Sequence, residues 1–137
     1  MTQHDNSHNQ FSVAEHTASI SGVLQRYFDG LYQSDAAQLQ DVFHPLAIYV
    51  CAVGGEFIYY TMKDYLPIVA QRPSPKSRGE ARQDRVLAIE VVGTATAVAR
   101  VTCAIAPKQF NDVLSLVYLD GRWQIIAKVF DYQISGN

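Results

Sequence analysis

Two β-rich runs, residues 112–119 and 122–130, constrain the fold more than any other feature of the sequence. They are separated only by Asp120-Gly121. Asp-Gly between two such runs is among the strongest hairpin signals, because a type I′ turn requires positive φ at both of its central residues. The sequence therefore predicts a long antiparallel hairpin, against which the preceding elements must pack.

The two-residue turn also predicts the register of this hairpin. Asp112 is expected opposite Val129, and side chains alternate between the two faces of the ladder. One face is then apolar apart from a single charge: Tyr118, Trp123, Leu116, Ile125, Leu114, Ala127, Val129 and Asp112. The other mixes apolar and polar residues: Leu119, Arg122, Val117, Gln124, Ser115, Ile126, Val113, Lys128, Asn111 and Phe130. The first face is expected to line the core, and the second to be a further covered surface.

Three helices are predicted in the first half of the chain. Short polar capping motifs mark their starts: Ser12-Val13-Ala14-Glu15, Ser34-Asp35 and Thr61-Met62-Lys63-Asp64. The first helix is expected over residues 13–33, where apolar residues recur every three or four positions. The second carries Leu39 and Val42 and ends before Pro45, and the third carries Tyr65 and Val69.

Strands account for the rest of the chain. A first hairpin is expected over residues 46–52 and 56–60, followed by strands over 82–92 and 95–106. Leu87, Ile89 and Val91 are expected on one face of the strand over 82–92. Helices followed by a meander indicate an α+β fold in which the N-terminal helices pack in a cone on a strongly curved, mostly antiparallel sheet. Such a cone leaves a cavity at its wide end.

The length of 137 residues is enough for one domain with a hydrophobic core. We expect a single cone-shaped domain over residues 12–137, after a flexible tail over 1–11. The net charge of −2, without a long run of either sign, gives no reason to expect nucleic acid or a membrane surface as a partner.

The expected location, and the expectation that there is no cofactor, are inferred from features that the sequence lacks. No apolar run approaches the ~20 residues of a spanning helix, and residues 1–10 lack the apolar segment of a secretory signal. The expected location is the cytoplasm. Cys51 and Cys103 lie inside apolar runs and are interpreted as buried free thiols. No metal site and no cofactor is expected.

The chain resembles the nuclear-transport-factor-two-like superfamily, whose fold is a cystatin-like cone. It is most similar to the branch described as putative lumazine-binding and related to polyketide cyclases. The resemblance covers about Ser12 to Tyr132 and is carried by the segment from Tyr27 to Leu31, Phe43-His44-Pro45 with Ala47, Arg72-Pro73, and residues 112–130. Relatives often have Asp where this chain has Leu46, so any chemistry of that carboxylate is missing here.

The resemblance implies several functions, because the superfamily contains isomerases, cyclases, dehydratases and epoxide hydrolases as well as transport and scaffold proteins. It also implies a homodimer formed through the outer face of the sheet. The half-apolar second face of the hairpin agrees with that expectation. Val117, Ile126 and Arg100 are the expected interface residues.

Asp112 and His44 are the candidate catalytic residues. Asp112 is the one charge on the expected core face, where desolvation would suit it to act as a general base; the alternative is a partly hydrated residue with a structural role at the start of its strand. His44 follows the second helix and could act as an acid or base near neutral pH. Its alternative role is to bond the backbone at the helix end.

Aromatic side chains are the candidate ligand-binding residues: Tyr27, Tyr49, Phe57, Tyr59, Phe110 and Trp123. Each could equally be a core residue, but together they would suit a flat aromatic or hydrophobic ligand. The sequence therefore predicts a small-molecule-binding protein with an apolar aromatic pocket. It could be a cofactor-independent isomerase, cyclase or dehydratase using acid–base chemistry. The alternative is a non-catalytic homodimeric interaction module whose cavity is filled by its own side chains.

Overall fold

A computed structural model describes residues 11–135 of the chain. Within these residues, three helices precede most of the sheet: α2 (Val13–Gln33), α3 (Ala36–Val42) and α4 (Met62–Gln71). The capping boxes expected at Ser12 and Thr61 are both formed, and Asp35 caps α3 by accepting a hydrogen bond from the Gln38 amide. These starts were predictable because the groups that cap a helix are its immediate sequence neighbours. The expected tail over residues 1–11 lies, except for Phe11, outside the described residues.

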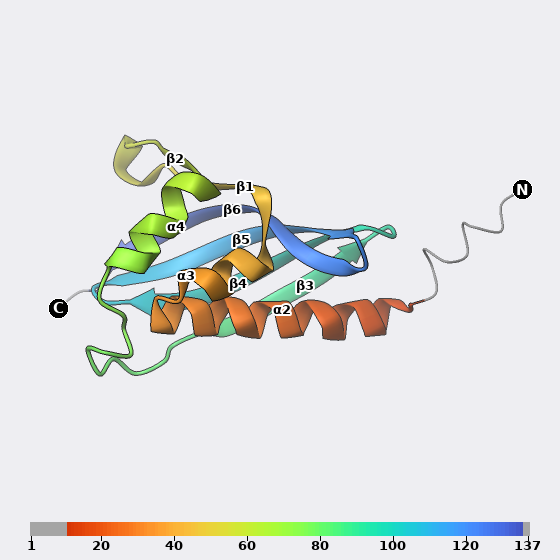
Figure 1. The fold of residues 1–137 in the computed structure, drawn as a ribbon, viewed down its shortest axis with the longest axis horizontal. Helices are drawn as coiled ribbons and strands as arrows, with labels where there is room; N and C mark the ends of the chain where they lie inside the picture. Colours follow the sequence, from red (N-terminus) through yellow and green to blue (C-terminus); the bar gives the residue numbers. More distant parts are fainter. Residues whose placement is uncertain (1–10, 136–137) are drawn as a thin grey trace, which may run out of the picture.

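A single six-stranded sheet has the order β2-β1-β6-β5-β4-β3 (Figure 1). Its strands are β1 (Phe43–Cys51), β2 (Ile58–Thr61), β3 (Arg85–Val92), β4 (Thr96–Ile105), β5 (Lys108–Leu119) and β6 (Arg122–Ile134). A short 3₁₀ turn, η1 (Val53–Gly55), joins β1 to β2. Only the β1–β6 pair is parallel; the other neighbours are antiparallel. The expected α+β cone on a mostly antiparallel sheet is confirmed.

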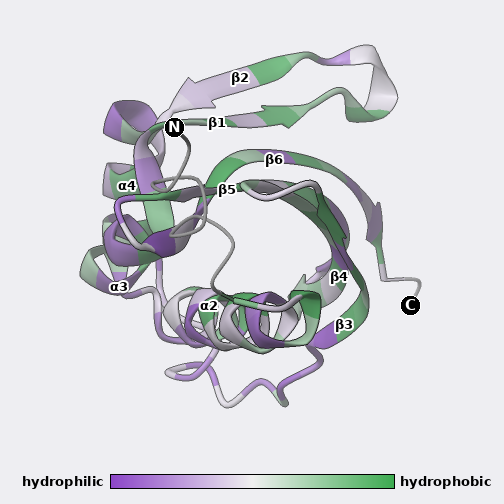
Figure 2. Ribbon diagram, turned by 90° about the vertical axis from the view of Figure 1, so that its right-hand side faces the viewer, coloured by the Kyte–Doolittle hydropathy of each residue, from purple (hydrophilic) through white to green (hydrophobic). Residues whose placement is uncertain are grey.

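The sheet curves around α2 without closing into a barrel, and α3 and α4 cover one side (Figure 2). The apolar stripe of α2 and the inner face of the sheet form one core. Small residues on β4, among them Ala97 and Ala99, are fully buried in it. Helix α2 thus lies inside the curve of the sheet and runs from one end of the cone to the other.

The predicted hairpin is correct at its turn and wrong further along. Asp120 and Gly121 both have positive φ, at 55° and 77°, and Tyr118 pairs with Trp123 as expected. A β-bulge then inserts Ile126, so the register shifts by one residue between Ser115 and Leu116. β1 is irregular against β6 over the same stretch. Bulges of this kind bend a strand and increase its twist, which suits a strongly curved sheet.

The bulge reverses the faces of the residues that follow it. Asp112 pairs with Phe130, not with Val129, and Leu114 pairs with Lys128, not with Ala127. Lys128 and Phe130, expected on the outer face, are 3% and 7% exposed, whereas Val129 is 47% exposed. The sequence pattern therefore assigned Lys128 to the wrong face, because strict alternation fails at an inserted residue.

A similar irregularity affects β3. Its register against β4 shifts between Val86 and Ala88. Ile89 and Val91 pack against the core with Val86, while Leu87, expected beside them, is 46% exposed. The bulge thus replaces Leu87 by Val86 on the inner face.

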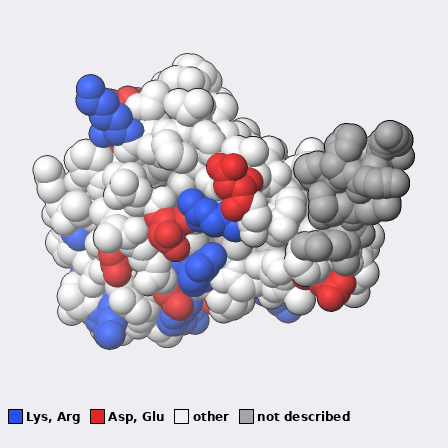
Figure 3. Space-filling view, turned by 45° about the vertical axis from the view of Figure 1, so that its right-hand side comes forward, with Lys and Arg blue, Asp and Glu red and all other residues white. Residues whose placement is uncertain are grey.

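Acidic and basic side chains are interspersed on the face of the molecule shown in Figure 3. Ion pairs such as Arg26–Asp41 and Arg82–Asp29 join exposed residues. No helix in the described part of the chain is long and apolar enough to cross a membrane.

Candidate functional site

The centre of the site is a buried carboxylate, Asp112 of β5, which is 2% exposed. The Tyr27 hydroxyl, from α2, donates a hydrogen bond of 2.6 Å to Asp112 Oδ2. The Lys128 ammonium, from β6, lies 3.9 Å from the same oxygen. Asp112 Oδ1 is buried and has no hydrogen-bond partner within residues 11–135. Of the two alternatives for Asp112, the structure shows the desolvated one, compensated by a cation.

Five aromatic rings surround the ammonium of Lys128. Its Nζ lies between 5.1 and 6.0 Å from their centroids: Tyr27, Tyr49, Tyr65, Phe110 and Phe130. Ring faces attract a cation at this range, more strongly when it is desolvated. Burial is the largest single influence on the pKa of Lys128 and acts to lower it, but the charge of Asp112, together with smaller contributions from Tyr65, Tyr49 and Cys103, raises the pKa above its usual value. The raised pKa favours the charged ammonium over a neutral amine nucleophile.

The pKa values of Tyr27 and Tyr49 favour their neutral phenols. Burial, reinforced by the charge of Asp112, raises the pKa of Tyr27 well above its usual value. Burial also raises the pKa of Tyr49 to about 12, although the charge of Lys128 opposes this. Asp112, Lys128 and Tyr27 thus form a buried triad of one ion pair and one hydroxyl donor.

A cavity of about 230 Å³ opens next to the triad at one end of the cone. Its residues come from the end of α4, the loop that follows it, the strands β1, β2, β4, β5 and β6, and the β4–β5 turn: Tyr49, Ile58, Arg72, Pro73, Arg78, Ile105, Ala106, Pro107, Lys108, Phe110, Phe130 and Tyr132. Tyr49, Phe110 and Phe130 belong both to this lining and to the cage of Lys128. The cavity is therefore bounded by the outer sides of the rings that enclose the ammonium.

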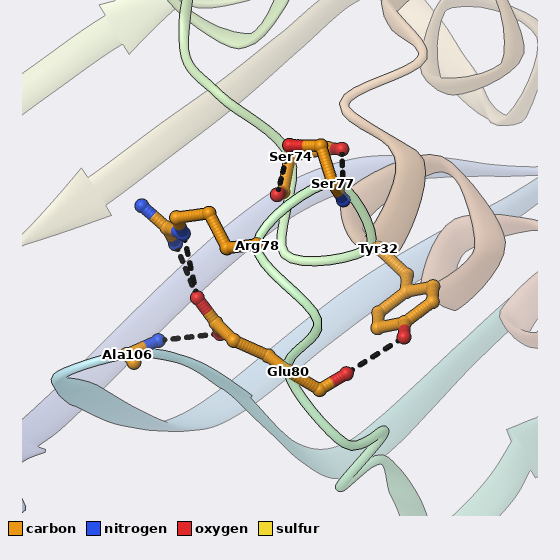
Figure 4. A network of polar contacts seen from close by, with 6 residues as sticks. All are labelled: Tyr32, Ser74, Ser77, Arg78, Glu80 and Ala106. Carbon is orange, nitrogen blue, oxygen red and sulfur yellow. Dashed lines mark hydrogen bonds and ion pairs between the residues drawn. The ribbon is translucent and has the colours of Figure 1, made fainter.

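The loop over residues 72–84 is tied to the fold beside this cavity by Glu80 (Figure 4). The Tyr32 hydroxyl donates to the Glu80 carbonyl oxygen at 2.7 Å, and the Ala106 amide donates to Glu80 Oε1 at 3.0 Å. Arg78 pairs with Glu80 Oε2 at 2.6 Å. These contacts join α2, the loop and the β4–β5 turn, and so fix the loop that forms part of the cavity wall.

The structure brings together only part of the predicted site. Tyr27 lies in the triad, and Tyr49 and Phe110 line the cavity. Trp123 is buried at the opposite end of α2, where its Nε1 donates to His16 Nδ1 at 3.0 Å. Phe57 and Tyr59 are 68% and 52% exposed and stack on each other. These last three aromatics do not share a pocket with Asp112.

His44 is likewise separate from Asp112. It lines another hollow, of about 280 Å³, between α3, β1 and α4. Its Nδ1 accepts a hydrogen bond from the Leu46 amide at 3.0 Å. The histidine thus bonds to the backbone two residues further along β1, and not to the end of α3 as its alternative role supposed. No hydrogen bond joins His44 to Asp112 among the described residues.

Sequence reasoning missed Lys128, Phe130 and Arg72 as site residues. Phe130 and Lys128 were placed on the outer face by the unbroken alternation. The available signals were the position of Lys128 in an otherwise apolar run and the Arg72-Pro73 motif of the family resemblance. No cluster that could hold a metal ion occurs within residues 11–135.

Comparison with known proteins agrees with this architecture. Residues 15–131 match the family described as putative lumazine-binding. An NTF2-like protein of unknown function from Silicibacter pomeroyi DSS-3 superimposes with a TM-score of 0.80 at 20% identity, over 90% of this chain and 100% of that one. An NTF2-like protein from Methylobacillus flagellatus KT gives a TM-score of 0.73 at 28% identity, over 90% and 95%.

A domain with a cystatin-like fold from Nostoc punctiforme PCC 73102 gives a TM-score of 0.70 at 13% identity, over 91% of this chain and 81% of that one. None of the curated proteins matches the chain significantly. The similarity to solved structures establishes the fold, and the family match covers most of the chain. The chain therefore belongs to the putative lumazine-binding family, within the NTF2-like fold.

Proposed function

We propose that the protein binds a small molecule with a flat aromatic or apolar body in the cavity beside the triad. The observation that carries this proposal is the cavity wall, in which the rings of Tyr49, Phe110, Phe130 and Tyr132 meet around about 230 Å³. Concave, mainly apolar sites with a few polar groups are typical of small-molecule binding. This volume is below the range of drug-sized sites, which begins at about 300 Å³, so a ligand of about two fused rings fits the proposal.

Binding without turnover agrees best with the position of Asp112. A general base must come within about 3 Å of the proton that it removes. Asp112 is 2% exposed and does not line the cavity. An acid–base enzyme is the second candidate, supported by the unpartnered Oδ1 of Asp112. It would require the aromatic wall to move aside during the reaction.

The self-filled interaction module remains a competing proposal for the inner part of the cone. Tyr27, Tyr65 and Phe43 are fully buried there and occupy the space that a larger ligand would need. The open cavity lies further out, which is why we favour ligand binding.

Paired variants test the binding proposal. Phe110→Leu shortens a wall of the cavity, whereas Phe57→Leu makes the same change at an exposed ring elsewhere. With the neutral probe 2-naphthamide, we expect Phe110→Leu to weaken binding roughly 3- to 10-fold by calorimetry, and Phe57→Leu to leave it unchanged. Equal effects of the two variants, or no binding by the wild type, would reject the cavity as a ligand site.

We further propose that two copies associate through the outer sheet face. Val113 and Val129 pair on this face and are 45% and 47% exposed, and the half-buried Val117 and Ile126 extend it. Val117→Glu should convert a dimer to monomers in sedimentation velocity, and Val13→Glu on α2 should not. A wild-type monomer at micromolar concentration would reject this interface. Arg100 is exposed on β4 and is an expected member of it.

A cytoplasmic location is also a proposal. It is supported by Cys51 and Cys103, which are buried and free, since free thiols are usual where the environment is reducing.

A further inference from the structure

The cavity contains an arginine whose hydrogen-bonding capacity is not used by the protein. Arg72 follows α4 directly, and its backbone amide bonds to the Val69 carbonyl oxygen at the helix end. Its side-chain Nε and Nη2 are both buried and have no hydrogen-bond partner within residues 11–135. Buried charged donors are almost always paired, because leaving them unpaired is costly.

The charges around the cavity do not balance. Its twelve lining residues include Arg72, Arg78 and Lys108 but no acid. Arg78 is neutralised by Glu80 at 2.6 Å. Lys108 rests on the Tyr132 ring, with its Nζ 4.5 Å from the centroid. Arg72 and Lys108 therefore leave an excess of positive charge at the wall.

The two unpaired nitrogens of Arg72 also indicate the shape of the group that would accept their hydrogen bonds. Nε–H and Nη2–H point from the same edge of the planar guanidinium, which is the edge that receives the two oxygens of a carboxylate in a bidentate pair. A carboxylate offers a separate oxygen to each of these two donors, whereas a halide or a carbonyl oxygen would have to be shared between them.

We propose that the ligand is an aromatic carboxylate whose two carboxylate oxygens accept hydrogen bonds from Arg72 Nε and Nη2. Its ring packs against Phe110, Phe130 and Tyr49, and Lys108 adds to the attraction at the mouth. This inference rests on the proposed binding function and adds to it the chemical class of the ligand.

Two matched probes test the charge preference. 2-Naphthoate and 2-naphthamide share their rings and differ in whether the polar group is an anion. We expect the wild-type protein to bind 2-naphthoate roughly 10- to 100-fold more tightly than 2-naphthamide in calorimetric titrations at pH 7, the range for a charge-assisted bond to a buried group.

Variants then attribute this preference to Arg72. Arg72→Gln should reduce it to less than about 3-fold while 2-naphthamide binds as before, and Arg72→Lys should retain part of it, since the charge stays but the planar fork is lost. Arg85→Gln is the control, because Arg85 is exposed on β3 outside the cavity lining. It removes the same charge and should leave the preference unchanged. Thermal unfolding of each variant establishes that it is folded.

The possible results distinguish a failure of the carboxylate site from a failure of the proposed binding function. Equal binding of both probes to the wild type, or a preference that survives Arg72→Gln, overturns the carboxylate site while leaving the cavity as a binding site. Failure of both probes to bind the wild type overturns the proposed function, and the carboxylate site with it.

Discussion

Each end of α2 buries a polar side chain against the sheet, but the two ends do so with different kinds of partner. Tyr27 and His16 lie eleven positions apart on this helix, about three turns. Both are buried, and both make a polar bond to the sheet. Tyr27 bonds to a carboxylate that is paired with an ammonium, at 2.6 Å. His16 accepts a bond from Trp123 at 3.0 Å and packs edge-on against Tyr118.

The difference between these ends indicates where function is concentrated. At the His16 end, the Trp123 donor and the His16 acceptor satisfy each other. At the Tyr27 end, Asp112 Oδ1 and two nitrogens of Arg72 have no partner within residues 11–135. Purely structural sites rarely leave buried polar atoms unpaired. The charged end is therefore the better candidate for a ligand site.

The largest expected effect is at the charged end. Lys128→Met keeps the length of the side chain but leaves the Asp112 carboxylate buried without a cation, so we expect it to lower the free energy of unfolding by about 3–5 kcal/mol. Urea denaturation measures this change. Adding Asp112→Asn should restore at least half of the loss, because asparagine still accepts the Tyr27 bond without carrying charge. A single-variant loss below about 1 kcal/mol, the value of a surface pair, would contradict the buried charge pair.

The next largest expected effect is a loss of stability at alkaline pH, to which Cys103 contributes. Burial, with a contribution from Asp112, raises the pKa of Cys103 to about 12 from a usual 9.0. The neutral thiol is thus favoured in the folded state, so its contribution to stability is complete below about pH 9 and is lost as pH rises towards 12. The expected slope from this one group is up to about 1.4 kcal/mol per pH unit.

Cys103→Ala measures that slope, when the free energy of unfolding is compared between the variant and the wild type from pH 8 to 11. Tyr27 and Tyr49 contribute losses of the same sign in both proteins. The variant should therefore lose stability less steeply than the wild type above pH 9. Parallel curves would show that Cys103 ionises equally easily in the folded and unfolded chains.

The smallest expected effect is at the neutral end. Trp123→Phe removes the indole N–H and leaves His16 Nδ1 without its donor. We expect a loss of about 1–2 kcal/mol in the free energy of unfolding, from one neutral hydrogen bond and from the smaller ring left at a buried position. The same denaturation assay checks it, with Phe57→Leu at an exposed position as the control. A loss as large as that of Lys128→Met would remove the contrast between the two ends.

Local features of this chain were predictable from sequence. The helix starts at Ser12 and Thr61 and the turn at Asp120-Gly121 depend on residues next to one another, and all three are correct. The expectation that Asp112 faces inward is also correct, even though its predicted partner across the ladder is wrong. Tyr27, Tyr49 and Phe110, three of the ligand-binding candidates, lie at the same end of the cone; their role in binding stays a prediction.

The partners of those residues were not predictable in the same way. Trp123 and Phe57 have the same aromatic character as Phe110, and only their positions in the fold separate them from the cavity. Arg72 follows a helix in a loop rich in polar residues, and although Arg72-Pro73 contributes to the family resemblance, neither that motif nor the local pattern indicates that its side chain is buried. Its burial depends on the packing of α4 against β1 and on the loop held by Glu80.

The helices, the closing hairpin, the α+β class and the inward face of Asp112 were all predictable locally, because capping, turn chemistry and hydrophobic periodicity act over a few residues. The identity of the cation that accompanies Asp112 depends instead on contacts between distant strands. The bulge at Ile126 lies where β6 meets both β5 and β1 in a strongly curved sheet. A single inserted residue there turns Lys128 inward. The alternation within one strand does not reveal this insertion, because the curvature that favours it is a property of the whole sheet.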